Sequence, residues 1–357
     1  EKGGGHPEAV EPMIHHHNAR PRANRTAMKS LLAKTGLPKA IGVYFDDRAI
    51  TVSQVVSTPF GPIETAQRSE PVRPDELPAV LRRVLKPLIA GSRIHQMPVA
   101  VGLPTCRTYF VTRPIQSPAS DASPEILLRE ALRSTSVSVN EMIVDVVKAQ
   151  PDKRPVAGIV ACQSDYLNNL LKALEGCGVR PRRAEPAPCA LLRAASKRHR
   201  ARHHGKVVVR LVLGESNVLA ILVVNDLPVL WRNVDLRQGD EAASLLSATR
   251  SLMAVSKDCG VQSPLDAVLI LGRTDLPRLL DTVWIDDRLG VPVQWFRDPA
   301  LESGQVAFGL ALGCFGEEDR AFDLSHSLKR RPSLWELFPW RQVAVQVAII
   351  HCLAFVL

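Results

Sequence analysis

Two short polar turns are the places in this sequence where a phosphate group and a magnesium ion would bind, but Tyr44 and Arg210 occupy the positions where metal carboxylates would be needed. Each turn lies between two apolar runs of the kind that form buried strands. The candidate residues are Tyr44, Asp46 and Asp47 in the first turn and Arg210, Gly214, Glu215 and Ser216 in the second. Magnesium prefers hard oxygen ligands such as carboxylates, and glycine lets backbone N–H groups approach a phosphate. The sequence therefore predicts a strand–turn–strand unit that occurs twice.

The segments around these turns indicate alternating strands and helices. Strands are predicted at 41–45, 50–56 and 63–67 around the first turn, and at 206–213, 217–224 and 229–232 around the second. Leucines at helical spacing predict an amphipathic helix that begins at a capping Ser164 and ends at Gly176 and Gly178. The chain has 357 residues, of which 46% are hydrophobic, and this is enough for a large core or two domains. The pattern favours the α/β class.

Several short motifs occur in an order that resembles a known family. They are 42–48 (GVYFDDR), 176–181 (GCGVRP), Glu185 followed by 189–194 (CALLRA), 271–273 (LGR), 289–293 (LGVPV) and 309–312 (GLAL). Their order and spacing resemble PilM, the actin-like protein of type IV pilus machinery, and the cytoplasmic part of GspL in type II secretion. The resemblance covers residues 40–316. It implies an α/β, duplicated, actin-like (ribonuclease-H-like) fold of two lobes, with a small inserted α/β subdomain at about 120–185.

The same resemblance implies a nucleotide cleft that has lost its chemistry. The family motif Gly-Ile-Asp-Ile-Gly-Ser-Ser places its metal carboxylate where this chain has Tyr44, and the second Asp-Ile-Gly motif aligns its carboxylate with Arg210. Asp46 and Asp47 put negative charge where phosphates would lie, and like charges at ~4 Å repel by about 4 kcal/mol at an effective dielectric of 20. Gly272, at the adenosine turn, is followed by a bulky Arg273. We therefore expect no catalytic residue, no metal and no bound ATP.

An active ATPase or kinase of the same fold is the alternative interpretation. In that case Asp46, Asp47 or Glu215 would bind Mg²⁺ with ATP in a shifted register of the turns. The Glu215–Ser216 pair keeps this alternative open.

The two ends of the chain differ from the region between them. Residues 1–39 are rich in Gly, Pro, Arg and His and are predicted to be disordered. Residues 317–341 are predicted to be a basic, aromatic juxtamembrane linker, and the apolar run 342–357 to be the start of a transmembrane helix. Positive charges before that run predict that residues 1–341 are cytoplasmic, on the bacterial inner membrane. PilM binds the short cytoplasmic leader of a membrane partner, and GspL-like chains carry both parts in one polypeptide. Residues 322–324 (FDL), then 337–340 (LFPW), then the apolar run resemble such a fused arrangement; an ordinary linker is the alternative.

The net charge of +9 is concentrated in one stretch. Residues 180–206 contain nine Lys and Arg residues against one acid, Glu185. No aromatic residue lies among the arginines, so nucleic acid is not favoured, and an anionic membrane surface or an acidic partner is the alternative. The histidines at 15–17 and His199, His203 and His204 could bind a metal, but both groups lie in polar stretches where a solvated loop is the simpler interpretation.

These observations favour a catalytically inactive, membrane-anchored scaffold rather than an enzyme. The resemblance implies that such a scaffold docks a secretion or pilus ATPase to the platform proteins of the inner membrane. It also leaves room for a homodimer. No Cys-x-x-Cys pair occurs among the seven cysteines, so no zinc or redox motif is indicated.

Overall fold

The computed structural model describes most of the central part of the chain. It covers residues 37–46, 48–73, 76–89, 97–115, 141–152, 154–194, 205–214, 217–237, 239–272, 282–297, 302–315 and 322–325. The predicted disordered lead (1–39) lies almost entirely outside these ranges, and the predicted membrane helix (342–357) lies wholly outside them. Among the described residues, no helix is both long enough and apolar enough to cross a bilayer.

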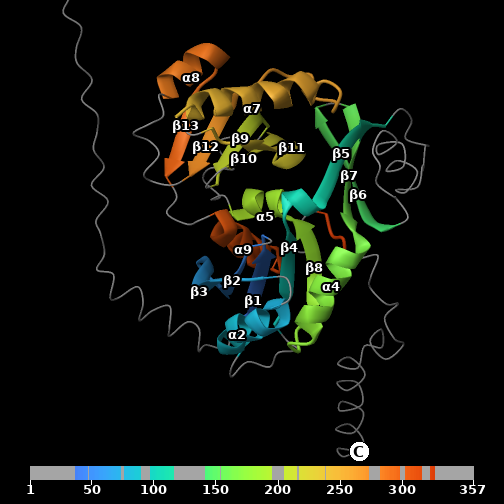
Figure 1. Cartoon of the computed structure of the whole chain (residues 1–357). Helices are drawn as coiled ribbons and strands as arrows, with labels where there is room; N and C mark the ends of the chain where they lie inside the picture. Colours follow the sequence, from blue (N-terminus) through green and yellow to red (C-terminus); the bar gives the residue numbers. More distant parts are fainter. Residues whose placement is uncertain are drawn as a thin grey trace, which may run out of the picture.

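Two five-stranded sheets share one topology, and this confirms the predicted duplication (Figure 1). Sheet 1 has the order β3-β2-β1-β4-β8 and sheet 2 the order β11-β10-β9-β12-β13. In each, the first three strands in sequence are antiparallel and the last two are parallel to the first. The strands of sheet 1 are β1 (Lys39–Phe45), β2 (Ala49–Thr58), β3 (Gly61–Pro71), β4 (Val99–Leu103) and β8 (Pro181–Pro186). Those of sheet 2 are β9 (Val207–Leu213), β10 (Asn217–Val224), β11 (Leu227–Asp235), β12 (Ala267–Gly272) and β13 (Val293–Arg297).

A three-stranded sheet, sheet 3, lies beside the two larger ones and is the predicted inserted unit. Its order is β5-β7-β6, with β5 (Thr108–Pro114), β6 (Met142–Asp152) and β7 (Arg154–Gln163). A short 3-10 turn, η3 (Thr105–Arg107), precedes β5. The unit therefore begins before the predicted residue 120. It also ends before the predicted residue 185, because β8 pairs with β4 and belongs to sheet 1.

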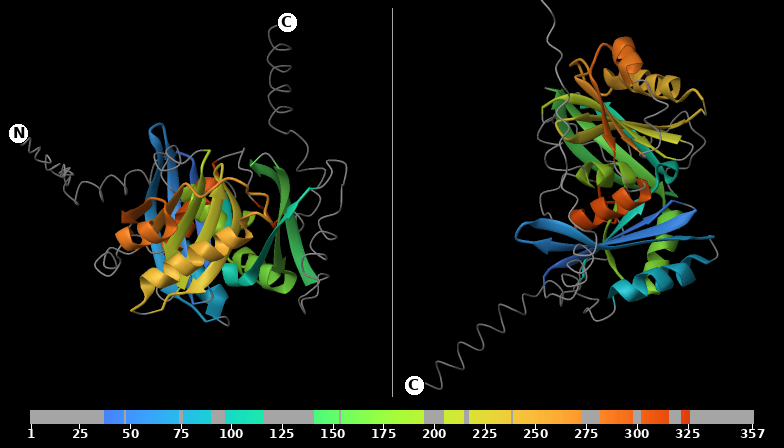
Figure 2. Two further views of the ribbon diagram at one scale, coloured as in Figure 1. Left: turned by 90° about the horizontal axis from the view of Figure 1, so that it is seen from above. Right: turned by 90° about the vertical axis from the view of Figure 1, so that its left-hand side faces the viewer.

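Helices separate and cover the sheets in layers (Figures 1 and 2). The outer face of sheet 1 carries α2 (Leu77–Ile89) and α4 (Ser164–Glu175), and the outer face of sheet 2 carries α7 (Glu241–Ser256) with α8 (Thr282–Leu289) beside it. Between the two sheets lie α5 (Ala187–Ala194) and α9 (Glu302–Gly313), which pack against each other. We call sheet 1 with its helices lobe 1, and sheet 2 with its helices lobe 2.

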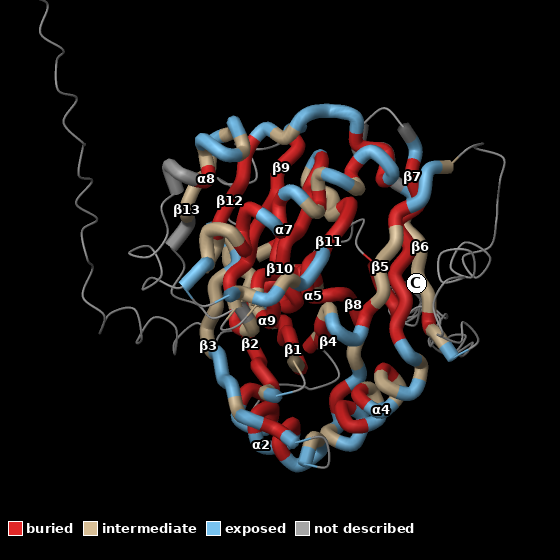
Figure 3. The backbone as a smooth tube through the Cα atoms, turned by 45° about the horizontal axis from the view of Figure 1, so that its top comes forward, coloured by how far each residue is buried: buried red, intermediate tan, exposed pale blue. Residues whose placement is uncertain are grey.

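The core is continuous from lobe 1 into lobe 2, as the buried central strands show (Figure 3). Val212, Ile221 and Trp231 of sheet 2 belong to the same buried cluster as the residues of β1 and β4. The outer face of sheet 2 forms a second cluster under α7. Valine and leucine supply most of both clusters, in line with the low aromatic content, because β-branched residues pack well on pleated surfaces.

One local prediction is wrong. Ser164 is the first residue of α4 and not its cap; the capping position is Gln163, and its side chain makes no capping hydrogen bond. The predicted end of that helix is confirmed, because the N–H of Gly176 binds the Lys172 carbonyl and Gly178 has a φ of 79°.

Candidate nucleotide cleft and docked segment

In the first candidate turn, the Asp46 side chain binds backbone N–H groups of the turn itself. Asp46 Oδ1 accepts hydrogen bonds from the backbone N–H groups of Arg48, at 3.0 Å, and Ala49, at 2.7 Å. The N–H of Asp46 itself donates to the Ala49 carbonyl, at 3.2 Å. A phosphate-binding turn needs such N–H groups to point at the anion. Here the Asp46 carboxylate already takes two of them. Asp47 lies outside the described residues.

The second candidate turn repeats the backbone geometry of the first. The N–H of Gly214 donates to the Asn217 carbonyl at 2.9 Å, as Asp46 does to Ala49. In both units four residues separate the last paired strand residues, which are Phe45 with Ile50 and Leu213 with Val218. Gly214 therefore corresponds to Asp46. Glu215 and Ser216 lie outside the described residues.

The strand register differs from the motif alignment by two residues. Counting back from the last pairs, Tyr44 corresponds to Val212. Arg210 lies two residues further from the second turn than Val212 and corresponds to Gly42. The parallel neighbours agree, because Tyr44 pairs with Gly102 and Val212 with Leu271. By strand register, the residue equivalent to Tyr44 in the second unit is thus Val212, whereas the motif alignment pairs Tyr44 with Arg210.

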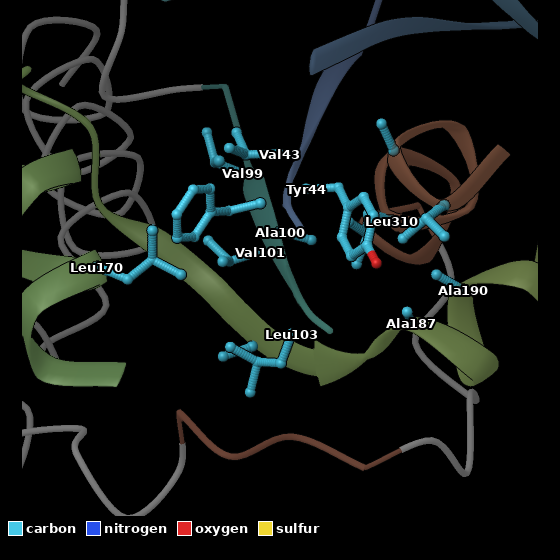
Figure 4. Close-up of a cluster of buried hydrophobic side chains, with 14 of the residues drawn as sticks. Val43, Tyr44, Val99, Ala100, Val101, Leu103, Leu170, Ala187, Ala190 and Leu310 are labelled. Atoms are coloured by element: carbon cyan, nitrogen blue, oxygen red, sulfur yellow. The ribbon is translucent and has the colours of Figure 1, made fainter. Parts of the chain in front are cut away.

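Tyr44 and Arg210 are both buried, with 6% and 4% of their surface exposed. Tyr44 points from β1 toward α9, beside Leu310 (Figure 4), and its ring lies against Gly102. Arg210 lies on the same face of β9 as Val212, by strand alternation. Both side chains occupy the layer between the sheets, where the resemblance implies the nucleotide.

Gly272 ends β12, where the resemblance implies the adenosine turn. A Cβ atom added to Gly272 would lie 2.9 Å from Cβ of Leu213. The open side of this glycine is therefore filled by the Leu213 side chain. Arg273 lies outside the described residues.

A buried ion triad lies where β8 meets α5. Glu185 is fully buried and receives two hydrogen bonds from Arg193, at 2.5 and 2.9 Å. Arg183 lies 3.2 Å from the same carboxylate. Arg193 also donates to the Gly309 carbonyl of α9, at 3.0 Å. Because both oxygens of Glu185 bind guanidinium groups, this acid is not available as a general base.

The layer between sheets 1 and 2 is held together by close backbone packing of α5 and α9, and sheet 3 contacts sheet 2 through a pair of aromatic rings. A side chain on Gly309 of α9 would overlap the Ala190 carbonyl of α5, and one on Gly42 of β1 would overlap the Ala307 carbonyl of α9. Phe110 of β5 stacks on Trp231 of β11, with ring centroids 3.7 Å apart and planes 8° apart. These contacts hold α5, α9 and the neighbouring strands close together in the layer between the sheets.

Residues 322–325, which we call the docked segment, lie along the free edge of β8. The N–H of Leu324 donates to the Ala184 carbonyl at 2.8 Å, and Asp323 Oδ1 accepts from the Ala184 N–H at 3.0 Å. Ser325 Oγ donates to the Arg182 carbonyl at 3.2 Å. The segment ends in a turn at Leu324 and Ser325, in which the Ser325 N–H also donates to Asp323 Oδ1 at 3.0 Å. It thus binds free N–H and C=O groups of an edge strand without forming a strand itself.

The docked segment also binds sheet 3. The Asp323 N–H donates to Asp145 Oδ2 of β6 at 2.6 Å. The Phe322 ring meets Phe110 edge-on, with centroids 5.7 Å apart and planes at 78°, and it lies against Gly158 of β7. All four residues of the segment are buried. The segment lies inside the predicted linker 317–341, so the folded body extends past the predicted boundary at 316.

The described residues contain no group of three or more His, Cys, Asp or Glu side chains suited to a metal. The histidine groups noted in the sequence lie outside the described ranges. Burial raises the pKa of the thiols of Cys162, Cys189 and Cys314 to about 12, so these cysteines stay protonated at neutral pH.

The sequence pattern drew attention to the two turns, Gly272 and Glu185, and it placed residues 322–324 in a linker rather than against β8. It missed the two arginines that bind Glu185, the Asp145 contact and the Phe110–Trp231 stack. The stack joins residues 121 positions apart in sequence, and no local pattern connects them. Arg193 lies on α5, eight residues after Glu185, and this short separation was the one signal in the sequence that the two side chains could form an ion pair.

Comparison with solved structures supports the fold. A PilM–PilN type IV pilus biogenesis complex matches with a TM-score of 0.56 and 19% identity, over 77% of this chain and 98% of that chain. The cytoplasmic domain of EpsL, an inner membrane component of the type II secretion system of Vibrio cholerae, matches with a TM-score of 0.49 and 14% identity, over 80% of this chain and 98% of that chain. No protein-family model matches the chain, and no curated protein matches it. The chain thus has the α/β actin-like fold that PilM has.

Proposed function

We propose that this chain is a membrane-anchored scaffold of a type IV pilus or type II secretion assembly, and that its nucleotide cleft is inactive. The observation that carries the proposal is the docked segment, because it joins both the β8 edge and sheet 3 to the chain that follows. Phe322 and Leu324 are buried in the main core, and Asp323 bonds to the Ala184 N–H of β8 and to the Asp145 carboxylate of β6. A force applied along the tail would therefore reach the actin-like body directly.

Three features support an inactive cleft. Two backbone N–H groups of the first turn are bound by Asp46. Tyr44 of the first unit corresponds by strand register to Val212 of the second. The side of Gly272 that faces Leu213 is filled. Among the described residues of the two turns, Tyr44 and Val212 offer magnesium no carboxylate, and Asp46 already binds two N–H groups that a phosphate would need.

The partners that we propose are the platform proteins and the assembly ATPase of such a machine, with residues 1–341 on the cytoplasmic side of the inner membrane. The PilM–PilN structure supports a platform partner, since that protein forms a complex in pilus biogenesis. The body would place the ATPase at the membrane without hydrolysing ATP itself.

The test of the inactive cleft is calorimetric titration of the full chain, in detergent or lipid nanodiscs, with Mg-ATP. We expect no binding heat and no phosphate release. Micromolar binding with turnover would overturn the proposal in favour of an active ATPase. In that case Asp46→Ala should remove the binding.

The test of the scaffold uses site-specific cross-linking in intact membranes. Cross-links from the described body to an ATPase or platform protein of a pilus or secretion system would support it. Detection of the chain only in a soluble fraction, without any such partner, would refute it.

A further inference from the structure

The docked segment gives the direction in which the chain leaves the body. Leu324 bonds to Ala184 and Ser325 to Arg182, so residue numbers in the segment rise as those in β8 fall. Arg182 is the second residue of β8. Ser325, the last described residue, therefore lies beside the start of β8, which follows the end of α4 after five residues.

This end of lobe 1 is strongly cationic. We define the basic end by its exposed cations, which are Arg82, Arg83, Lys86, Lys172, Arg180 and Arg182. Neither α2 nor the stretch 176–183 contains an acidic residue. Two contacts bring these elements together: Arg82 Nη2 donates to the Gly176 carbonyl at 3.4 Å, and Cys177 Sγ donates to the Pro78 carbonyl at 3.8 Å.

Acids also lie next to these cations. Glu76, which is exposed, directly precedes α2. Glu70 pairs with Arg83 at 2.6 Å. Glu175, at the end of α4, is the acid nearest in sequence to the turn at Gly176, and Asp165 lies at the opposite end of α4. The helix that covers the opposite pole of the molecule, α7, is balanced, with Glu241 and Arg250. The charge asymmetry thus coincides with the exit of the tail.

We propose that the basic end is the surface with which the body lies on anionic phospholipid headgroups. The inference rests on the proposed function, because the tail leaving at Ser325 would carry the membrane anchor. Lysine and arginine side chains near an anionic leaflet are attracted over about one Debye length, ~8 Å at physiological salt. A tether attached at Ser325 holds this end near the membrane, and tethering makes even weak individual contacts effective. The exposed positions of α2 include no aromatic side chain, so base stacking is not provided for.

Lysine footprinting of the full chain in lipid nanodiscs tests this proposal. Acetylation of each lysine is followed by mass spectrometry in discs of phosphatidylglycerol and in discs of phosphatidylcholine. We expect Lys86 and Lys172 to react about threefold or more slowly in the anionic discs, and the difference to vanish at about 0.5 M NaCl. Lys257, exposed at the end of α7, is the internal control and should react equally in both.

Charge reversal provides a matched comparison. Arg82→Glu with Arg180→Glu should remove the protection of Lys86 and Lys172, whereas Arg250→Glu on α7 should leave it intact. Both changes are at exposed positions, and thermal melts check that the fold is kept. Equal labelling of Lys86 and Lys172 in the two lipids overturns the proposal. So does equal protection of Lys257, which would mean nonspecific adhesion.

Two further outcomes separate this proposal from others. If short duplex DNA or an acidic peptide protects these lysines and phosphatidylglycerol does not, the surface serves a different partner and the proposal is wrong. If the full chain does not co-elute with nanodiscs, the anchor in the proposed function fails. The same lysine labelling with added phosphatidylglycerol vesicles then tests whether the basic end binds anionic lipid independently of the anchor.

Discussion

The buried triad at Glu185 allows a quantitative prediction for the change Glu185→Gln. The wild-type carboxylate is fully buried and binds Arg193 through both oxygens, with Arg183 at 3.2 Å. Substitution by glutamine removes the negative charge and leaves two nearly buried guanidinium groups without a counter-ion. Breaking a buried ion pair from one side costs about 3–5 kcal/mol, because the remaining charge stays desolvated. We expect the free energy of unfolding to fall by an amount in this range.

Urea denaturation followed by circular dichroism measures this loss. A loss of about 3 kcal/mol lowers the midpoint by about 1 M when the slope is near 3 kcal/mol per M. Glu70→Gln is the matched control, because Glu70 also pairs with an arginine, Arg83, at 2.6 Å, but the side chains of Glu70 and Arg83 are 28% and 63% exposed. An exposed pair contributes about 1 kcal/mol or less, so this control should change the midpoint little.

A combined substitution tests the reason for the loss. Replacing Glu185, Arg183 and Arg193 together with apolar side chains of similar size should recover much of the stability, because no buried charge then remains. The reasoning is refuted if Glu185→Gln costs no more than Glu70→Gln. It is also refuted if the combined change is far worse than the single one.

Three further predictions concern the lobe junction, the closed turn and the thiols. Gly309→Ala should lower the free energy of unfolding by about 1–3 kcal/mol in thermal melts, because its Cβ would overlap the Ala190 carbonyl. Gly176→Ala is the control and should change that free energy by under about 1 kcal/mol, because its Cβ would lie 3.4 Å from the nearest atom, the Lys172 carbonyl oxygen. Asp46→Ala should cost about 1–2 kcal/mol in the same assay, since two N–H groups lose their acceptor, and Mg-ATP should still give no binding heat. Burial raises the pKa of Cys162, Cys189 and Cys314 to about 12 in the folded chain, well above the ordinary value of a thiol. The unfolded chain therefore releases these protons first, and urea midpoints should fall as pH rises from 9 toward 12. Cys314→Ala should make that fall shallower; an unchanged slope would contradict the assignment.

Much of the fold could be predicted because its signals are local. Apolar runs of strand length, separated by short polar turns, identified β1, β2, β9 and β10, and their repetition gave the two lobes. The extent of sheet 3 was harder to predict, because β5 belongs to it only by pairing with β7, about 50 residues later. Strand length and polarity are the same whichever sheet a strand joins.

The candidate site could be predicted only in part, because register is a property of the pairing. The motif alignment matched Arg210 with Tyr44, whereas the pairs Phe45–Ile50 and Leu213–Val218 match Val212 with Tyr44. A shift of two residues keeps every side chain on its original face, so the apolar pattern of β9 did not reveal it. The hydrogen bonds of Asp46 depend on backbone directions in the turn, which composition does not specify.

The docked segment and the junction of the lobes form one connected set of contacts. Phe322 meets Phe110, and Phe110 stacks on Trp231 of lobe 2, while Asp323 bonds to β6 and to β8. A cleft that opens and closes around a nucleotide would need the lobes to move relative to each other, and each movement would break these contacts together. A body that instead keeps them gains a fixed distance between the tail at Ser325 and the far face of lobe 2. That property agrees with the proposed role as a scaffold between a membrane and a partner.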